Sequence, residues 1–577
     1  YGCGALTSIN LPGTVTSIGS NAFLGCSSVT EVSIPPSVTL MYDTFQSAYT
    51  KITKVSLVGN WISINSTVFN GCSAITDVSI PPCATKLSTV FPNTYSKITT
   101  VALVGNWTSI GTSAFSGCSA LANIDIPATV NYIGPTAFYN CRALTSINIP
   151  SGLTSINAST FSECSALTSI TIPSGVTSIS ASVFDGCSAL SNITIPNTVN
   201  SIGARAFYGC SALTSINIPP AVASFDYSTF EECSALASIN IPSGMTNLGV
   251  YTFTGCSALT GINIPAGVTE IGEGTFSGCS ALSGIVIPSA VTSIGPSAFR
   301  GCSALTSVNI PSGVTIIGSS AFYRCSAMTS VNIPSGVTII EDGVFNECRL
   351  LTGIIIPSGV TSIGVGAFAE CTALTSINIP SGVTSIGSSA FYGCIGLTSI
   401  DIPSGVTSIG AVAFYGCSVP TSIAIPATVT SIGTNAFKGC SGITEISIPP
   451  CVSRLSTMFP DAYFNINKVA FVGNWTSVSV ENFKECTALT NINIPTTVTS
   501  IRSSAFYGCI GLTSIDIPSG VTSIEDSVFY GCNALTSIII PSGVTSVASN
   551  TFLTCIGLTP VEFPASVTIT ASSAFVE

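Results

Sequence analysis

The sequence contains no histidine, and only 7% of its residues are charged. Without histidine there is no Ser-His or Cys-His pair for nucleophilic catalysis, and no metal site with imidazole ligands. The carboxylate pairs Glu231-Glu232 and Glu341-Asp342 are adjacent in sequence, so we interpret them as solvated surface groups. A net charge of −11 disfavours nucleic-acid binding. We therefore expect no enzymatic activity, no cofactor and no nucleic-acid partner.

Long apolar runs are also absent. Although 46% of the residues are hydrophobic, Ser, Thr, Asn, Gly and Pro interrupt every run before it reaches the length of a membrane span. This segment is therefore predicted to have no membrane span. No signal peptide or initiating Met is visible, and both ends fall inside a repeat rather than in a capping repeat. We expect a fragment, a processed chain, or a protein whose ends are covered by neighbours.

What the chain does have is a period of 23 residues. Steps of 23 from Cys3 define 25 positions, here called the Cys slots, and 22 of them hold Cys. Pro follows nine residues after every slot except at Val58, Val104 and Val472. A fixed period of this size is typical of a solenoid, whose units bury their core against each other. The sequence predicts a single repeat solenoid over residues 1–577, with about 25 units.

The local pattern predicts the same four parts in each unit. In the copy that begins at Cys371, apolar and polar residues alternate over 376–379, which indicates a half-buried strand that a Pro-Ser-Gly turn ends. The β-branched residues of 383–386 predict a second short strand, and Gly387 suits a positive φ. Residues 388–394 are predicted to form one helical turn, with Ser as its cap.

The 24 cysteines fit a column of buried thiols better than a set of disulfides. Stacking would place successive slots roughly 4.8 Å apart with parallel Cβ vectors, whereas a disulfide needs Cβ atoms about 3.8 Å apart that turn toward each other. Cys83 and Cys451 lie off the column. These two are candidates for a bridge, a reactive thiol or an intermolecular link.

Asn recurs seven residues after the Cys slot, on the predicted solvent side of the first strand. Identical charges stacked at the strand spacing would repel, whereas Asn, Thr and Ser can stack and hydrogen-bond. Two interpretations stay open, a solvated strand face and a broad polar binding surface. The candidate binding residues on this column are Asn148, Asn217, Asn240, Asn263, Asn309, Asn332 and Asn378.

Three variant repeats, at about 36–61, 82–107 and 450–475, have Tyr in the Cys slot. They hold every Trp of the chain, their Phe comes one residue early, and basic residues gather near them. Trp either fills the volume that these exchanges rearrange, or supplies a contact point to a partner or to another copy of the chain. The candidate residues are Trp61, Trp107, Trp475, Lys51, Lys54, Lys86 and Arg454.

Five Asn-x-Ser/Thr motifs are candidate N-glycosylation sites on exposed turns of a secreted eukaryotic protein. They are Asn65, Asn106, Asn157, Asn192 and Asn474.

The full repeat resembles the 23-residue leucine-rich repeat of BspA-like surface proteins, the Treponema pallidum type. The residues that carry the resemblance in one copy are Leu374, Ile377, Ile379, Pro380, Val383, Ile386, Gly387, Ala390, Phe391 and Cys394. The resemblance implies a right-handed solenoid with a strand-lined concave face and no catalytic residues. It also implies a surface protein used in adhesion, and the Thr/Ser/Ile-rich version looks like those of microbial eukaryotes.

We therefore expect an extracellular or cell-surface protein that binds a protein or glycan through its extended strand-lined face. The alternative is a structural protein that assembles head to tail into a filament or sheath, because its repeats are uniform and its charge is low. The regular Thr and Ser columns also leave ice binding open.

Overall fold

The computed structural model describes residues 2–41, 44–45, 48–64, 68–417, 421–559, 561–565 and 567–569. The chain forms a parallel β-solenoid of about 24 turns, as the period predicts. It divides into two compact units, residues 1–290 and 291–577. That the whole chain is one continuous domain stays a prediction.

Within the described residues, most turns of the solenoid contribute a first strand, and most contribute a two-residue second strand. The pairing is parallel, with a register step of 23 residues; Ser307 of one turn, for example, pairs with Ser330 of the next. The alternation predicted for the first strand is present, because Ser307 and Asn309 are exposed while Val308 between them is buried. The sequence period therefore sets the strand register directly.

Among its described residues, unit 1 contains eighteen of these strands. Its first strands are β1 Ser8–Asn10, β3 Glu31–Ile34, β5 Lys54–Leu57, β6 Asp77–Ile80, β7 Thr100–Leu103, β9 Asn123–Ile124, β12 Ser169–Thr171, β14 Asn192–Thr194, β16 Ser215–Asn217 and β17 Ser238–Asn240. Its second strands are β2 Ser17–Ile18, β4 Leu40–Met41, β8 Ser109–Ile110, β10 Tyr132–Ile133, β11 Ser155–Ile156, β13 Ser178–Ile179, β15 Ser201–Ile202 and β18 Glu270–Ile271.

Unit 2 follows the same plan. Its first strands are β20 Ser307–Asn309, β22 Ser330–Asn332, β24 Gly353–Ile355, β26 Ser376–Asn378, β29 Ser422–Ala424, β31 Glu445–Ile448, β32 Lys468–Phe471, β34 Asn491–Asn493, β36 Ser514–Asp516, β38 Ser537–Ile539 and β40 Val561–Glu562. Its second strands are β19 Ser293–Ile294, β21 Ile316–Ile317, β23 Ile339–Ile340, β25 Ser362–Ile363, β27 Ser385–Ile386, β28 Ser408–Ile409, β30 Ser431–Ile432, β33 Ser477–Val478, β35 Ser500–Ile501, β37 Ser523–Ile524, β39 Ser546–Val547 and β41 Thr568–Ile569.

The segment before each Cys is not a helical turn in the ordinary repeats, which corrects the sequence prediction. The N–H groups of Ser389, Phe391 and Gly393 donate to carbonyl oxygens of the next repeat at 2.7–2.9 Å. Positive φ angles at Ser389 (57°) and Gly393 (70°) break the helical path. Alternate N–H groups therefore bond forward along the stack, and this segment makes a third inter-repeat ladder.

Gly387 also differs from the prediction, because it has no positive φ. A Cβ atom at this position would lie 2.6 Å from the backbone carbon of Gly364 in the preceding repeat. Such a distance is far inside van der Waals contact, so glycine is required here by close approach of two backbones.

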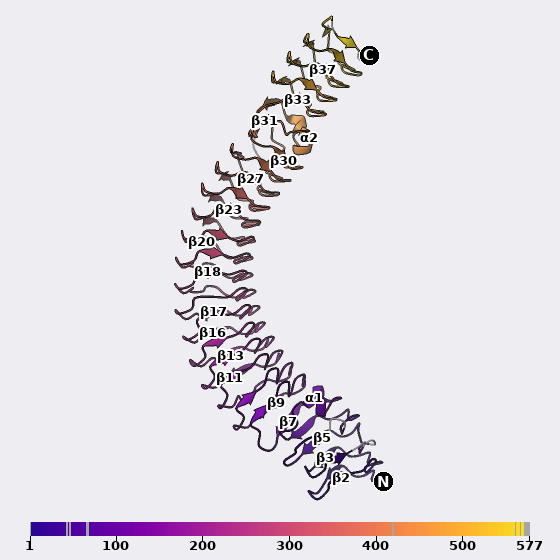
Figure 1. Ribbon diagram of the computed structural model, residues 1–577, viewed down its shortest axis with the longest axis vertical. Coiled ribbons are helices and arrows are strands. Elements are labelled where there is room, and N and C mark those ends of the chain that lie inside the picture. The colour runs from indigo at the N-terminus through magenta and orange to yellow at the C-terminus, as the bar shows by residue number, and fades with distance from the viewer. Residues whose placement is uncertain are drawn as a thin grey trace. The chain divides into compact units, whose positions relative to one another are not determined.

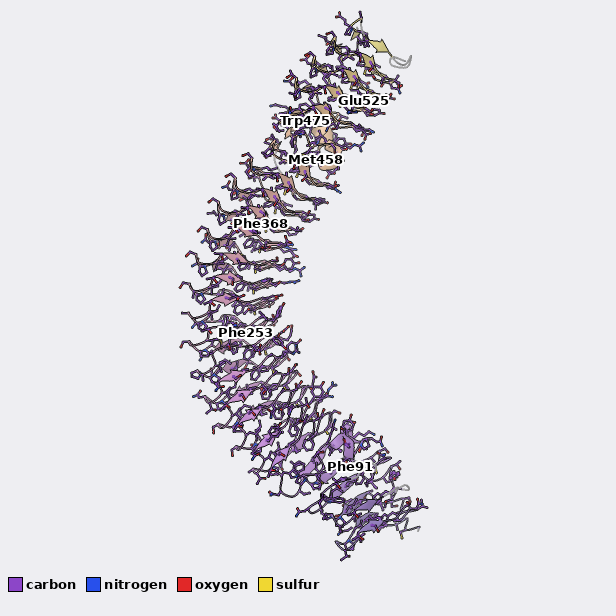
Figure 2. All side chains as sticks on the ribbon, in the orientation of Figure 1. Phe91, Phe253, Phe368, Met458, Trp475 and Glu525 are labelled. Atoms are coloured by element: carbon purple, nitrogen blue, oxygen red, sulfur yellow. The ribbon has the colours of Figure 1, made fainter. Side chains whose placement is uncertain are left out.

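The core lies between the ladders. Leu374, Val383 and Phe391 are fully buried in one typical repeat, as is Cys394 in its slot. The Phe rings stack from repeat to repeat, with centroids 5.4 Å apart for Phe368 and Phe391. Phe253 of unit 1 and Phe368 of unit 2, labelled in Figure 2, belong to these columns.

Threonine columns connect the repeats from the outside. Thr375 Oγ1 donates to Thr352 O at 3.3 Å, and Thr384 Oγ1 donates to Thr361 O at 3.2 Å. Threonine, which stands on the surface where stacked charged side chains would repel each other, therefore also supplies hydrogen bonds between turns.

The variant repeats accommodate their early Phe by changing the turn. Two of them contain a short α-helix, α1 Leu87–Val90 and α2 Leu455–Met458, followed by the 3₁₀ helices η1 Tyr95–Lys97 and η2 Tyr463–Asn465 (Figure 1). Tyr95 N–H donates four residues back, to Phe91 O, whereas Cys118 N–H in an ordinary repeat donates three back, to Phe115 O. The wider turn accommodates the one-residue shift, so Phe91 still packs against Phe69, with ring centroids 4.9 Å apart and the rings tilted by 32°.

Candidate binding surfaces

The strand face presents the polar column that the sequence singles out. All seven of its candidate Asn residues are exposed. Asn217 pairs in register with Asn240, and Asn309 with Asn332. The fold therefore brings these side chains into neighbouring positions on one face within each unit.

In unit 2 the column is interrupted by an exposed apolar residue that the sequence reading did not single out. Ile355 is 78% exposed, between Asn332 and Asn378 in the column. Gly353, two residues earlier on β24, adds no side chain beside it. Two shallow grooves, of about 410 and 510 Å³, meet at Asn309, Asn332 and Ile355.

Unit 1 repeats this arrangement. Val286 is 81% exposed in the same column, Gly284 precedes it by two residues, and a groove of about 390 Å³ runs past Asn263 and Val286. Within each unit, an apolar side chain thus stands in a polar row beside a hollow. Both positions could have been found from the sequence by comparing the residue seven places after the Cys slot across all repeats.

Two of the three Trp residues are buried rather than presented. Trp107 and Trp475 are each 1% exposed, and their indole N–H groups donate to Val104 O and Val472 O, both at 3.1 Å. These side chains fill core volume, which is the first of the two interpretations from sequence. The second interpretation, direct contact with a partner, does not apply to these two buried side chains.

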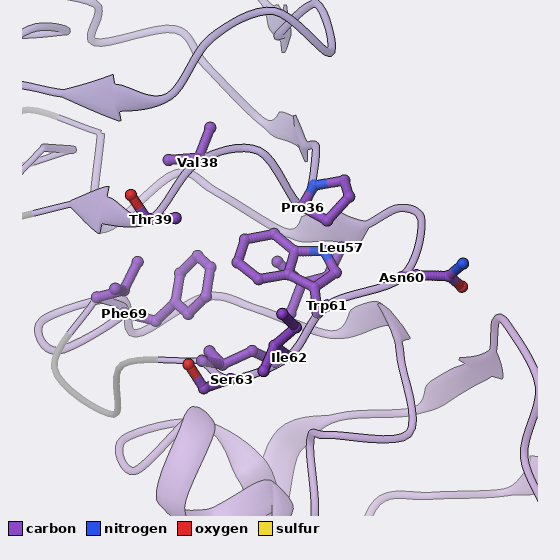
Figure 3. A pocket seen from close by; sticks show the side chains of 11 residues that line it. Pro36, Val38, Thr39, Leu57, Asn60, Trp61, Ile62, Ser63 and Phe69 are labelled. Carbon is purple, nitrogen blue, oxygen red and sulfur yellow. The ribbon is translucent and has the colours of Figure 1, made fainter.

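Trp61 is different from the other two. Its indole lines a pocket of about 260 Å³, between Pro36 and Phe69 in Figure 3. Its N–H has no hydrogen-bond partner within the described part of the chain, and neighbouring Ile62 is 96% exposed. Trp61 keeps its place as a candidate contact residue.

The basic candidates lie on the surface, and two of the four pair with acids. Lys54 lies 3.8 Å from Glu31, its register neighbour, and Arg454 pairs with Glu481. Lys51 and Lys86 are exposed. Opposite charges alternate here from one strand to the next, as in Glu31, Lys54 and Asp77, so the variant repeats avoid the repulsion expected of a like-charged column.

The cysteine column is buried and free of disulfides. Twenty of the 24 thiols are buried, Cys3 is exposed, and Cys83, Cys451 and Cys555 are half-buried. Ladder thiols donate to the Phe carbonyl 26 residues earlier; Cys394 Sγ, for example, lies 3.1 Å from Phe368 O. Burial raises the pKa of Cys118 from 9.0 to about 12. The prediction of free thiols in a core column is confirmed.

Neither off-column thiol shows the depressed pKa of a reactive cysteine. Burial raises the pKa of both Cys83 and Cys451. Cys451 Sγ donates to Val429 O at 3.2 Å. A role for either in an intermolecular link stays a prediction.

The glycosylation motifs differ in exposure. Asn106, Asn192 and Asn474 are exposed, and Asn106 and Asn474 each follow a glycine with positive φ on a turn. Asn157 is half-buried and its amide donates to Ile133 O at 2.6 Å, so this side chain is poorly placed to receive a glycan. Asn65 lies outside the described residues.

Metal-ligand clusters and membrane-spanning helices were sought among the described residues. No group of three or more His, Cys, Asp or Glu side chains there is placed to hold a metal ion. No helix in the same part of the chain has the length and apolarity to cross a membrane.

These features define a leucine-rich repeat solenoid. The chain belongs to the BspA-type leucine-rich repeat family, whose region of six repeats matches it from end to end in overlapping segments. The matched segments are residues 1–122, 85–191, 108–237, 178–304, 224–351, 269–388, 338–459 and 456–577.

Solved structures include similar proteins from bacteria. A leucine-rich repeat protein from Bacteroides ovatus is 30% identical with a TM-score of 0.49, over 63% of this chain and 92% of that one. A leucine-rich cell surface protein from Faecalibacterium prausnitzii is 23% identical with a TM-score of 0.31, over 70% and 89%. The leucine-rich repeat protein of T. pallidum is 26% identical with a TM-score of 0.23, over 36% and 78%. Comparison with curated proteins finds no match. A microbial eukaryote as the source stays a prediction.

Proposed function

We propose that this chain is an extracellular or cell-surface binding protein that holds a protein partner on its strand face. The observation that carries the proposal is Ile355, an exposed apolar side chain that stands among asparagines where two grooves meet. An apolar anchor surrounded by polar groups is the usual composition of a protein-binding hot spot.

The surrounding residues suit an extended segment of a partner. Asn309 and Asn332 each offer an amide donor and acceptor, and the adjoining turn residues are small. Because the column repeats at each turn, a partner can make the same polar contact several times along one unit. Exposed Asn106 and Asn474 support an extracellular location, where they would carry glycans.

The proposal is tested with peptides selected from a random display library against the immobilised chain. We expect Ile355→Asn, which restores the column residue, to weaken the binding of a strand-face peptide at least tenfold, because the anchor is lost. Ile395→Asn is the matched control; it makes the same exchange at a 56% exposed isoleucine next to a Cys slot, away from the strand column. Equal weakening by both variants, or none by either, would contradict the proposal.

Glycan binding and head-to-tail assembly remain predictions. Electron microscopy at two protein concentrations separates the assembly from the binding role. Filaments that lengthen with concentration would favour the structural alternative.

A further inference from the structure

Three of the seven arginines in the chain lie within two residues of three successive Cys slots of unit 2. Together with Tyr323 and Glu347, Arg300, Arg324 and Arg349 form what we call the arginine patch, beside the turn ladder. The guanidinium carbons of Arg300 and Arg324 each lie 5.0 Å from the centre of the Tyr323 ring. Three cations and one carboxylate share the patch, so its local charge is opposite to that of the whole chain.

Glu347 holds the patch in shape. One of its oxygens accepts from Arg324 Nε at 3.0 Å and from Tyr323 Oη at 2.9 Å, and the other accepts from Arg349 Nη2 at 3.2 Å. Burial opposes ionisation of this carboxyl, but the hydrogen bonds from Arg324 and Tyr323 outweigh it and lower the pKa. The two guanidinium groups are therefore oriented before any ligand arrives.

The oriented groups border a hollow of about 310 Å³ lined by Gly301, Ser303, Arg324, Ser326, Glu347 and Arg349. Each of the two arginines uses one N–H nitrogen on Glu347, and Arg324 also makes a hydrogen-bonding contact with Tyr323. The other N–H groups of the two guanidinium groups have no further hydrogen bond among the described residues. The Ser326 hydroxyl is also unbonded there, whereas Ser211 and Ser257 in equivalent slots donate to the repeat before. Unused donors thus converge on one small hollow.

A further acid in the same column as Glu347 does not close the patch. Glu370 occupies the slot after Glu347, but its carboxyl packs over Gly393 in the following repeat. No hydrogen bond or ion pair joins Glu370 to these arginines within the described part of the chain. The cationic donors therefore face solvent, with Arg324 and Arg349 side chains 58% and 56% exposed.

We propose that the arginine patch binds an acidic side chain, Asp or Glu, of a peptide segment in a partner protein. The planar guanidinium fork matches a carboxylate in two parallel hydrogen bonds. A sugar ring would need an open aromatic face, and guanidinium groups already lie over the ring of Tyr323. The site rests on the proposed protein-binding role for its ligand class, but its residues are separate from the strand column.

The test uses a fluorescein-labelled octaglutamate peptide and the whole chain, with binding followed by fluorescence anisotropy in 50 mM salt. We expect Arg324→Ala with Arg349→Ala to weaken binding at least tenfold. The double variant Arg142→Ala with Arg205→Ala removes the same charge from unit 1, where Arg205 also pairs with a carboxylate and lies over a tyrosine. We expect this control to change binding less than twofold.

Glu347→Gln provides the opposite test, since it removes the internal carboxylate that occupies the donors. We expect it to tighten peptide binding several-fold, which loss of folding cannot imitate. Equal losses in both double variants, or no tightening in Glu347→Gln, would overturn the site.

Tighter binding of a sulfated hexasaccharide than of octaglutamate, lost in the same double variant, would overturn the ligand class. The Ile355→Asn variant is expected to leave octaglutamate binding unchanged, so failure here and failure of the strand-face proposal are separable.

Discussion

At the scale of single residues, the tightest constraint is a run of glycines at the end of the second strand. Gly364, Gly387, Gly410 and Gly433 occupy this slot in four successive repeats, and a Cβ at Gly410 would lie 2.2 Å from Ser388 N. The same slot holds Gly134, Gly203 and Gly318 in other repeats, where a Cβ would also lie 2.5–2.7 Å from a backbone nitrogen. The demand for glycine therefore recurs at this slot wherever the backbones of neighbouring repeats approach this closely.

We predict that Gly410→Ala destabilises the chain by about 1–3 kcal/mol, the usual cost of overpacking a filled site. The measurement is the midpoint of urea unfolding. Gly353→Ala serves as the control, because its Cβ would meet nothing within 4 Å and its φ is not positive. An unchanged midpoint for Gly410→Ala would show that the repeats can separate here at no cost.

At the scale of structural elements, the buried thiols of the cysteine column share a raised pKa, so we expect them to lose their protons over the same alkaline pH range. Most ladder thiols are buried and bond to a carbonyl of an earlier repeat, as Cys371 Sγ does to Phe345 O at 3.1 Å. Burial raises the pKa of thiols such as Cys118 and Cys348 from 9.0 to about 12. The folded state therefore holds protons that the unfolded state has already released at pH 10.

This difference predicts unfolding in alkali. Below pH 9 both states are protonated and the thiols do not make stability depend on pH. Above pH 9 the unfolded state binds fewer protons, so each thiol whose pKa is raised in this way lowers the free energy of unfolding by about 1.4 kcal/mol per pH unit until its folded pKa is reached. Because burial raises the pKa of many thiols along the column, we expect circular dichroism to show a steep loss of strand signal above pH 9. A signal that stays flat to pH 11 would contradict the shared titration.

At the scale of the whole molecule, most of the fold could be predicted because one period fixes strands, register and core together. Ile386 and Leu374 are buried where the 23-residue pattern places them. The turn ladder could not be predicted, because the i to i+3 spacing of Phe391 and Cys394 fits both a helical turn and a turn whose N–H groups bond to the next repeat. Only the positive φ at Ser389, a residue without a strong preference for it, separates the two.

The candidate surfaces were predictable only in part. The Asn column follows from alternation along a strand, and its exposure is confirmed. Burial of Trp107 depends on how the repeats around it pack, which no single repeat encodes. Ile355 and the arginine patch arise from residues 23 and 25 positions apart, so they emerge only when successive repeats are laid side by side.

The most direct test of the account is a count of accessible thiols, because the solenoid core is built around a reduced cysteine column. We predict that iodoacetamide modifies at most four cysteines in the native chain without reductant, namely Cys3, Cys83, Cys451 and Cys555. In denaturant, still without reductant, all 24 should react, as read from intact mass. Rapid native modification of most thiols, or failure of the denatured chain to react until it is reduced, would contradict the buried thiol column and the stacking that it reports.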